Sequence, residues 1–314
     1  MKLIYFFWAW CCAWAKIEGE NPSGSHKHRL AAAKVESLRK TGRIGHGQAI
    51  LLLSSSGRMA EAFAMQTADI DGVRLIIVSD KLSPDALLAK LRKFSHVELI
   101  VVDKPDSTNS HLEARLRVID DLKKRYPHAI YIDQYSDELL PIAYLDSLVE
   151  EVLEQTTGHM SIIFVPTGTG ATLRAFDLDK FINGRRYIIQ PVDAEGSSLF
   201  RKGNGGRHYS GYGNGRQTEY CRSCTTIADP IYVDDVEVAR MANWLLITQQ
   251  LCVGPSSAAA AAAFVQAARR FPSRLPHWGI PVLIFPDHGE PYMDSLYNDD
   301  WLIANGLGKA ITGP

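Results

Sequence analysis

The stretch AKIEGENPSGSHKHR, residues 15–29, joins a predicted strand to a predicted helix. Apolar residues precede it, Asn21 and Pro22 form a turn signal, and a small-residue loop leads into a helix that starts near Ser25. Lys27 therefore falls in the first helical turn, where its charge meets the positive end of the helix dipole. Either Lys27 is a tolerated surface lysine, or its neutral form is favoured and suited to form a Schiff base.

Outward from this stretch, strand-like runs alternate with helix-like runs. The predicted strands cover residues 48–54, 74–79, 97–102, 161–165, 187–192 and 282–285, and the predicted helices cover residues 57–67, 83–94, 111–125, 147–155, 236–250 and 257–270. This alternation predicts an α/β protein with mostly parallel sheets flanked by helices. The 314 residues suggest about two domains at roughly 150 residues each.

The composition excludes several classes of protein. A hydrophobic share of 46% and a charged share of 22% are typical of a globular chain rather than a disordered or fibrous one. The formal charge of −1 gives no footprint for nucleic acid or an anionic membrane, so we expect neither partner. Five cysteines are too few for a disulfide scaffold, and their odd number favours reduced thiols in the cytoplasm.

The longest apolar run extends from Leu3 to Ala15. It is short of the roughly 18–20 residues that a membrane-spanning helix needs. It is either a buried strand rich in aromatic residues or a secretory signal, because Ala13-Trp14-Ala15 resembles an A-x-A cleavage site. We favour the strand, because cleavage would start the mature chain at Lys16, on the edge of the most informative motif.

Two further turns follow predicted strands and precede predicted helices. In PTGTGAT, residues 166–172, successive N–H groups can form an anion nest. This turn lacks the lysine of a nucleoside-triphosphate loop and the third glycine of a dinucleotide loop, so it suits a single phosphate monoester; an ordinary turn is the alternative. In SSSGRM, residues 54–59, hydroxyl and N–H groups suit a substrate carboxylate, although this signal is weak alone.

Residues 195–222 break the alternation, because they are dense in Gly, Ser, Asn and Arg. A loop of this length is usually functional or disordered. Cys221 and Cys224 form a lone CxxC, which we interpret as free thiols rather than a zinc or redox site. We interpret His26 and His28 as packing or solvated residues, so no metal site is predicted.

The order of these motifs resembles the cysteine synthase and cystathionine β-synthase family, whose members are pyridoxal-phosphate (PLP) enzymes of the tryptophan-synthase-β-like fold. Residues 16–29 resemble its K-x-E-x-x-N-P-[ST]-G-S-x-K-x-R block. The other matches are residues 54–60 with T-S-G-N-T-G, 79–92 with P-x-x-x-S-x-E-K-x-x-x-L-R, 133–135 with N-Q-[FY], 168–172 with G-T-G-G-T, 254–259 with G-[IG]-S-S-G-A, and 286–292 with P-D-S-G-E-R-Y.

The resemblance implies a fold type II PLP enzyme with two domains. The larger, PLP-binding domain would comprise residues 1–40 and 150–314, and the smaller, mobile, substrate-binding domain residues 41–149. Lys27 would hold the cofactor as an internal aldimine and move the Cα proton. The other cofactor-binding candidates are Arg58, Gly168, Thr169, Gly170, Ala171, Thr172 and His288, and the substrate-binding candidates are Ser55, Ser56, Gly57, Gln134 and Gly213.

The activity implied is β-replacement on an O-activated L-serine through an aminoacrylate. The nucleophile is open; residues 207–216 weakly resemble enzymes that make 2,3-diaminopropionate precursors, which favours an amine or amino acid. One alternative is a serine/threonine dehydratase-like lyase that stops at elimination. Another is a catalytically impaired paralogue that acts as a binding partner. We also expect a homodimer.

Several positions depart from the family pattern. Arg58 replaces the asparagine at the cofactor phenolate oxygen, and nothing in the sequence obviously balances its charge. A more anionic substrate such as O-phosphoserine would do so, unless Arg58 turns to solvent or pairs with Glu61. His288 replaces the serine at the pyridine nitrogen, which it could serve as a neutral donor, unless it points away and a neighbour supplies the contact. Ala171 replaces a glycine.

The opening G-N-T-P-L strand of the family is missing. Either the start is assigned late, or this is a divergent member.

Overall fold

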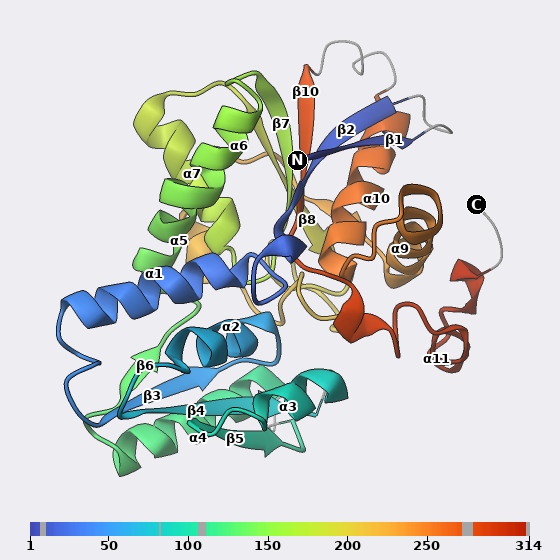
Figure 1. The fold of residues 1–314 in the computed structure, drawn as a ribbon. Helices are drawn as coiled ribbons and strands as arrows, with labels where there is room; N and C mark the ends of the chain where they lie inside the picture. The colour runs from blue at the N-terminus through green and yellow to red at the C-terminus, as the bar shows by residue number, and fades with distance from the viewer. Residues whose placement is uncertain (7–10, 82, 106–110, 272–278, 312–314) are drawn as a thin grey trace. The chain divides into compact units, whose positions relative to one another are not determined.

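The computed structural model describes residues 1–6, 11–81, 83–105, 111–271 and 279–311 (Figure 1). It divides into two compact units, which we call the larger unit, Met1–Glu20 with Pro141–Pro314, and the smaller unit, Asn21–Leu140. These bounds differ from the sequence-based domains at two segments. The helix α1, Lys27–Lys40, falls in the smaller unit, where it packs on α2, Arg58–Thr67. Residues 141–149 fall in the larger unit.

Among the described residues of the larger unit, six strands form one sheet in the order β1-β2-β10-β7-β8-β9. β1 pairs antiparallel with β2, and the remaining pairs are parallel. The described parts of the apolar run at the start of the chain therefore form strands, as favoured, and residues 7–10 of the run lie outside the described residues. The bounds are β1 Lys2–Phe6, β2 Cys11–Ile17, β7 Met160–Pro166, β8 Ile188–Ala194, β9 Ile231–Val233 and β10 Ile280–Phe285.

Helices cover this sheet, with α7 and α10 on opposite faces (Figure 1). The alanine run of α10 is buried at every position from Ala258 to Ala263, because the helix packs on β7–β10 and also against α9. Small side chains allow this close approach on both sides. The bounds are α5 Leu139–Tyr144, α6 Glu150–Gln155, α7 Ala171–Asn183, α8 Glu219–Ser223, α9 Asp235–Gln249, α10 Pro255–Arg270 and α11 Asp299–Ala304.

The smaller unit contains a parallel sheet whose described strands run in the order β5-β4-β3-β6. α2 and α4 lie on opposite faces of it (Figure 1). Leu51–Leu53 and Leu75–Val78 are buried on both faces, which explains why these strands are continuous apolar runs. The bounds are β3 Ala49–Ser54, β4 Val73–Asp80, α3 Asp85–Leu91, β5 Val97–Val102, α4 His111–Arg125 and β6 Ile130–Ile132.

The α/β class and the predicted strands and helices are confirmed, with ends that shift by a few residues. The predicted helix at residues 147–155 begins earlier, at Leu139, and contains a π-helical turn at Leu145–Val149 between α5 and α6. The short β9 and α11 were not predicted, because three to six residues carry too little periodicity.

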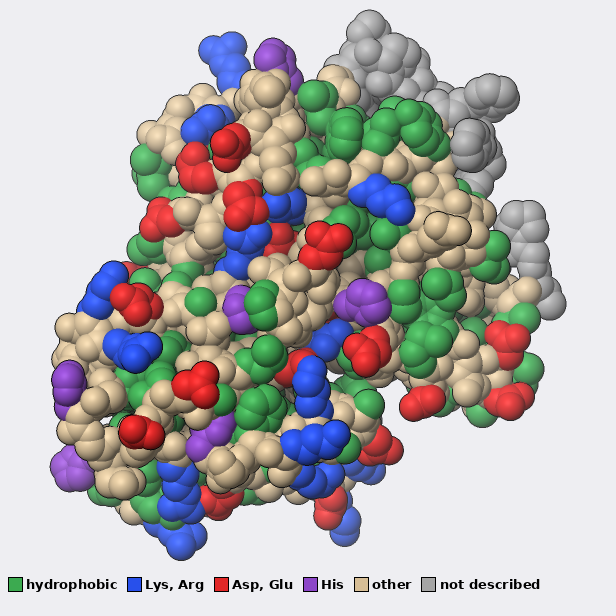
Figure 2. Space-filling view, viewed as in Figure 1, with side chains coloured by type: hydrophobic (Ala, Val, Ile, Leu, Met, Phe, Trp, Pro, Cys, Tyr) green, Lys and Arg blue, Asp and Glu red, His purple; other side chains and the backbone are tan. Residues whose placement is uncertain are grey.

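The surface shown in Figure 2 carries acidic and basic side chains interspersed, which agrees with the near-zero net charge. Within the described residues, no helix is both long enough and apolar enough to cross a membrane.

Candidate cofactor and substrate site

The predicted phosphate turn links β7 to α7 in the larger unit. Gly170 is the N-cap of α7, with a φ of +93°, and a Cβ on it would lie 2.7 Å from Sγ of Cys221. A Cβ on Gly168 would lie 2.9 Å from the carbonyl oxygen of Gly211. No side chain caps this helix, so the N–H groups of its first turn, from Ala171 onward, can bind an anion.

A second loop, residues 207–214, packs against the phosphate turn and forms hydrogen bonds with it. The N–H of Gly213 donates to the carbonyl oxygen of Thr167 at 2.7 Å, and Nδ2 of Asn214 donates to that of Gly168 at 3.4 Å. Nη1 of Arg207 donates to the carbonyl oxygen of Tyr212 at 3.0 Å. The structure thus brings Gly213 to the phosphate turn, within the irregular loop that the sequence indicated as functional or disordered.

A buried polar cluster lies at the N terminus of α10. Asp287 accepts hydrogen bonds from the hydroxyls of Ser256 at 3.2 Å and Tyr292 at 2.8 Å. Ser256 also lies near the second loop, because a Cβ on Gly211 would be 3.7 Å from its Oγ. Ser256 was not predicted as a site residue, although residues 254–259 carry part of the resemblance; its burial and its proximity to Gly211 depend on tertiary packing.

His288 follows this cluster with an exposed side chain. Its Nδ1 accepts a hydrogen bond from the N–H of Glu290 at 3.1 Å, which favours a tautomer with the proton on Nε2. That is the donor form required by the predicted contact with the pyridine nitrogen. The contact itself stays a prediction, and Ser256 is the neighbouring hydroxyl that could supply it instead.

Lys27 is the first residue of α1, in the first helical turn as predicted. It lies in the smaller unit, whereas the sequence-based bounds assigned residues 1–40 to the larger domain. His26 before it is buried, and burial together with the charges of Lys27 and Arg29 holds the pKa of His26 well below its ordinary value. The hydroxyls of Ser23 and Ser25 are buried and have no hydrogen-bond partner among the described residues. The loop before Lys27 therefore presents polar groups that the surrounding protein leaves unsatisfied.

The predicted carboxylate turn links β3 to α2 in the same unit. Nε2 of Gln134 donates to the carbonyl oxygen of Ser54 at 2.6 Å, so the structure brings Gln134 to this turn as predicted. The N–H of Gly57 donates to Oγ of Ser55 at 3.3 Å, whereas the buried Oγ of Ser54 has no partner in the described part of the chain. Ser56, which lies between Ser55 and Gly57 in the chain, is half-buried.

Arg58 begins α2, and its guanidinium lies over the loop before Lys27, because a Cβ on Gly24 would be 3.4 Å from its Nη1. The expectation that nothing balances its charge is wrong. Nη1 of Arg58 pairs with the buried carboxylate of Glu61 at 2.8 Å, one turn along the helix. Glu61 also pairs with Lys90, so two cations share one carboxylate. The sequence alternative of an Arg58–Glu61 pair is therefore the arrangement observed.

Cys221 and Cys224 are free thiols, and burial raises the pKa of Cys221 to about 11. Cys221 packs on Gly170, which accounts for its burial. Among the described residues, no group of three or more His, Cys, Asp or Glu side chains could hold a metal ion.

Residues 11–285 match the family model described as pyridoxal-phosphate dependent enzyme. The chain belongs to this family. One relative is N-(2-amino-2-carboxyethyl)-L-glutamate synthase from Cupriavidus metallidurans, which is 32% identical over 302 residues, or 95% of this chain and 86% of the relative. The predicted family, its cofactor and its enzymatic character are thereby confirmed.

Solved structures of two enzymes have the same fold. A hydrogen sulfide-producing enzyme from Fusobacterium nucleatum has a TM-score of 0.80 and 22% identity, with 90% of this chain and 92% of that chain covered. An O-acetylserine dependent cystathionine beta-synthase from Helicobacter pylori has a TM-score of 0.77 and 22% identity, with 91% and 89% covered. The predicted fold type II architecture is confirmed.

The residues present fit PLP. The uncapped, glycine-lined N terminus of α7 suits its phosphate. In the smaller unit, the buried hydroxyls of Ser23, Ser25 and Ser54 are costly to leave unsatisfied, so a polar ligand would stabilise them. The predicted site residues fall in both units, and the role of each remains a proposal.

Proposed function

We propose that the protein is a PLP-dependent enzyme that performs β-replacement on an O-activated L-serine, with the amino group of an amino acid as nucleophile. The observation on which this most depends is the glycine-lined, uncapped N terminus of α7, which suits a permanently held phosphate. The name of the relative supports the nucleophile, because its product carries a 2-amino-2-carboxyethyl group on the nitrogen of glutamate.

Different residues of the chain bind the cofactor and move the proton. When bound, PLP supplies an electron sink for loss of the Cα proton and of the β-substituent. Lys27 Nζ holds the cofactor and moves the proton at Cα of the substrate. Residues Gly168–Thr172 hold the phosphate through main-chain N–H groups. Ser256 or His288 donates to the ring nitrogen.

The smaller unit binds the amino acid substrate. Ser55, Ser56 and Gly57 with Gln134 bind its carboxylate, since hydroxyl, N–H and amide groups gather at this turn. The guanidinium of Arg58 beside this turn offers a fork of donors, which favours a phosphate leaving group over acetate. Gly213 also contributes to substrate binding. Its N–H donates to the carbonyl oxygen of Thr167, which holds the second loop against the phosphate turn. We further propose a cytoplasmic homodimer, which the free cysteines permit.

The test is a spectral titration of the PLP-loaded protein. O-phospho-L-serine should shift its visible spectrum, and L-glutamate added afterwards should restore it. Mass spectrometry should then detect N-(2-amino-2-carboxyethyl)-L-glutamate and inorganic phosphate in equal amounts. Lys27→Ala provides the inactive control.

Other outcomes separate the alternatives. Pyruvate formed at the same rate with or without glutamate would indicate the elimination lyase. A protein that never turns yellow with PLP would contradict both enzymes and leave the impaired paralogue.

A further inference from the structure

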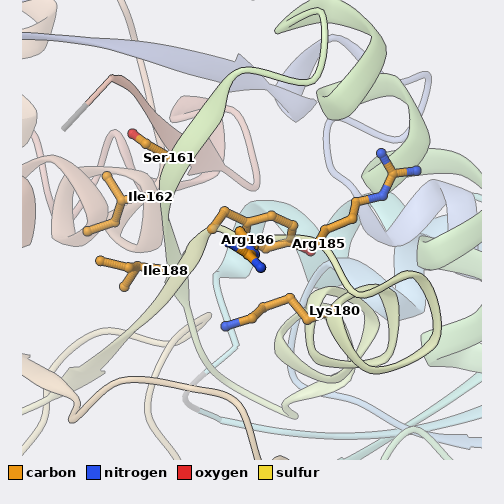
Figure 3. Close-up of a pocket in the computed structure, with 7 residues that line it drawn as sticks. Ser161, Ile162, Lys180, Arg185, Arg186 and Ile188 are labelled. Carbon is orange, nitrogen blue, oxygen red and sulfur yellow. The ribbon is translucent and has the colours of Figure 1, made fainter. Parts of the chain in front are cut away.

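A cavity of about 460 Å³ opens on the larger unit, away from the phosphate turn (Figure 3). Its walls come from Ser161 and Ile162 at the start of β7, from Lys180 in the last turn of α7, and from residues 185–188. The phosphate turn follows the other end of β7. The distance from Ala171 to Lys180 along the axis of α7 is about 14 Å at 1.5 Å per residue. The cavity and the phosphate turn are therefore separate places on the same two elements.

The lining of the cavity is cationic and contains no acidic residue. Arg185 is already balanced, because its Nε lies 3.1 Å from Oδ1 of Asp179, and its side chain extends away from the other two cations (Figure 3). Lys180 donates to a neutral acceptor, the carbonyl oxygen of Thr226, at 3.0 Å. Arg186 is exposed and makes no hydrogen bond or ion pair with any residue that the structure describes.

Stabilisation of α7 explains only part of this cluster. A lysine in the last turn of a helix interacts favourably with the helix dipole, which accounts for Lys180. It does not account for Arg186, which lies beyond the helix end and is left with its full charge. Since the whole chain carries a net charge of −1, the two uncompensated cations are a local feature rather than a general excess.

An apolar wall faces these cations. Ile162 and Ile188 lie across the cavity from Lys180 and Arg186 (Figure 3), and Ile188 is 49% exposed. The hydroxyl of Tyr187 bonds to the buried Asp179 at 2.7 Å, so its polar end is already satisfied. A ligand with an apolar body would remove exposed isoleucine surface from water.

We propose that this cavity binds an organic phosphate, a phosphate monoester with an apolar body. Such a group carries a charge of about −1.5 to −2 at pH 7, which matches the two uncompensated cations. The Arg186 guanidinium offers a planar fork of donors and the Lys180 ammonium a point charge, a combination that suits phosphate. Ile162 and Ile188 contact the apolar body.

The test uses the PLP-loaded protein and phenyl phosphate as probe, with binding followed by titration calorimetry. We expect one site of this kind, and Arg186→Gln should weaken its affinity at least about tenfold, the loss expected for one charge-assisted hydrogen bond. Lys180→Gln should weaken it comparably. Arg43→Gln, which removes an exposed arginine of the smaller unit, is the matched control and should bind like the wild type.

Two further measurements locate the site and define the ligand. The visible spectrum of the bound cofactor should not change on binding of phenyl phosphate, which separates this cavity from the substrate site. Inorganic phosphate, which lacks the apolar body, should bind more weakly. Wild-type affinity in Arg186→Gln, a spectral change with the same midpoint, or equal affinity for the two probes would overturn the proposal. None of these results depends on whether the enzyme replaces or eliminates the β-substituent.

Discussion

Two turns in this enzyme have the same plan, a parallel strand followed by a small-residue turn and a helix, but they differ in what lines them. The turn between β7 and α7 is lined by main chain: Gly168 and Gly170 lie where a Cβ would collide with Gly211 or Cys221. The turn between β3 and α2 is lined by side chains, including the hydroxyls of Ser54 and Ser55.

We propose that this difference corresponds to two kinds of ligand. Main-chain N–H groups held by close packing lose no side-chain entropy when they bind, which suits a cofactor phosphate that stays in place. Hydroxyls and the Arg58–Glu61 pair can rearrange, which suits a substrate that enters and leaves in each turnover.

The largest effect is expected at Lys27, which we propose serves both ligands. Lys27→Ala should lower kcat by at least about a thousandfold, because it removes the group proposed to move the Cα proton. Borohydride reduction followed by peptide mapping should label Lys27 in the wild type. Lys40→Ala, at the exposed end of the same helix, is the control and should keep full activity. A label on another lysine would refute the assignment.

A β-branched residue at Gly170 should weaken PLP binding by roughly a hundredfold, since one or two charge-assisted hydrogen bonds of about 1.5–3 kcal/mol would be lost. Gly170→Val combines an unfavourable φ of +93° with a clash against Cys221. Gly184→Val is the control that has the unfavourable φ without the clash. Gly184 ends the same helix at a φ of +62°, and a Cβ there would have nothing within 4 Å. This variant should lower stability and leave the PLP dissociation constant unchanged. Equal PLP affinity in both variants would contradict the main-chain cradle.

Replacing a buried carboxylate by an amide should change the free energy of unfolding in opposite directions in the two units. Asp193, at the end of β8, is fully buried with Oδ2 unpartnered among the described residues, and burial raises its pKa to about 6 from an ordinary 3.8. The folded state therefore binds more protons than the unfolded state between these pH values, and stability falls as pH rises through that window. Asp193→Asn should raise the free energy of unfolding by about 1–3 kcal/mol above pH 6 and by little near pH 4.

The matched comparison is Glu61→Gln, which should lower stability at neutral pH because it removes the buried carboxylate that pairs with the partly buried Arg58. Urea unfolding at pH 4.5 and 7.5 distinguishes the two cases. A stability gain of Asp193→Asn that is the same at both pH values would show that its charge is not the cause.

The smallest effect is expected in substrate choice. Arg58→Asn should lower the ratio of kcat/KM for O-phospho-L-serine to that for O-acetyl-L-serine by about tenfold, the value of one charge-assisted hydrogen bond. Lys90→Gln, the second cation on Glu61, should lower the ratio less, because its side chain is 52% exposed and screened by solvent. If Arg58→Asn leaves the ratio unchanged, the Glu61 pair holds Arg58 away from the substrate.

The sequence by itself determined the α/β class, nearly all the long helices and strands, and the two turns, because these depend on local periodicity and on glycine, proline and serine signals. It also indicated the Arg58–Glu61 pair, since residues three apart on a helix are neighbours. The resemblance then supplied the family and the cofactor.

Only the tertiary structure decided the contacts made across long stretches of chain. The packing of Cys221 on Gly170, the Gln134 bond to Ser54, and the sharing of Glu61 with Lys90 join residues that are 29 to 80 positions apart. No periodicity encodes such pairs, because they depend on how strands order within a sheet and how loops close on its edge. For the same reason, the proximity of Ser256 to Gly211 is evident only in the folded protein.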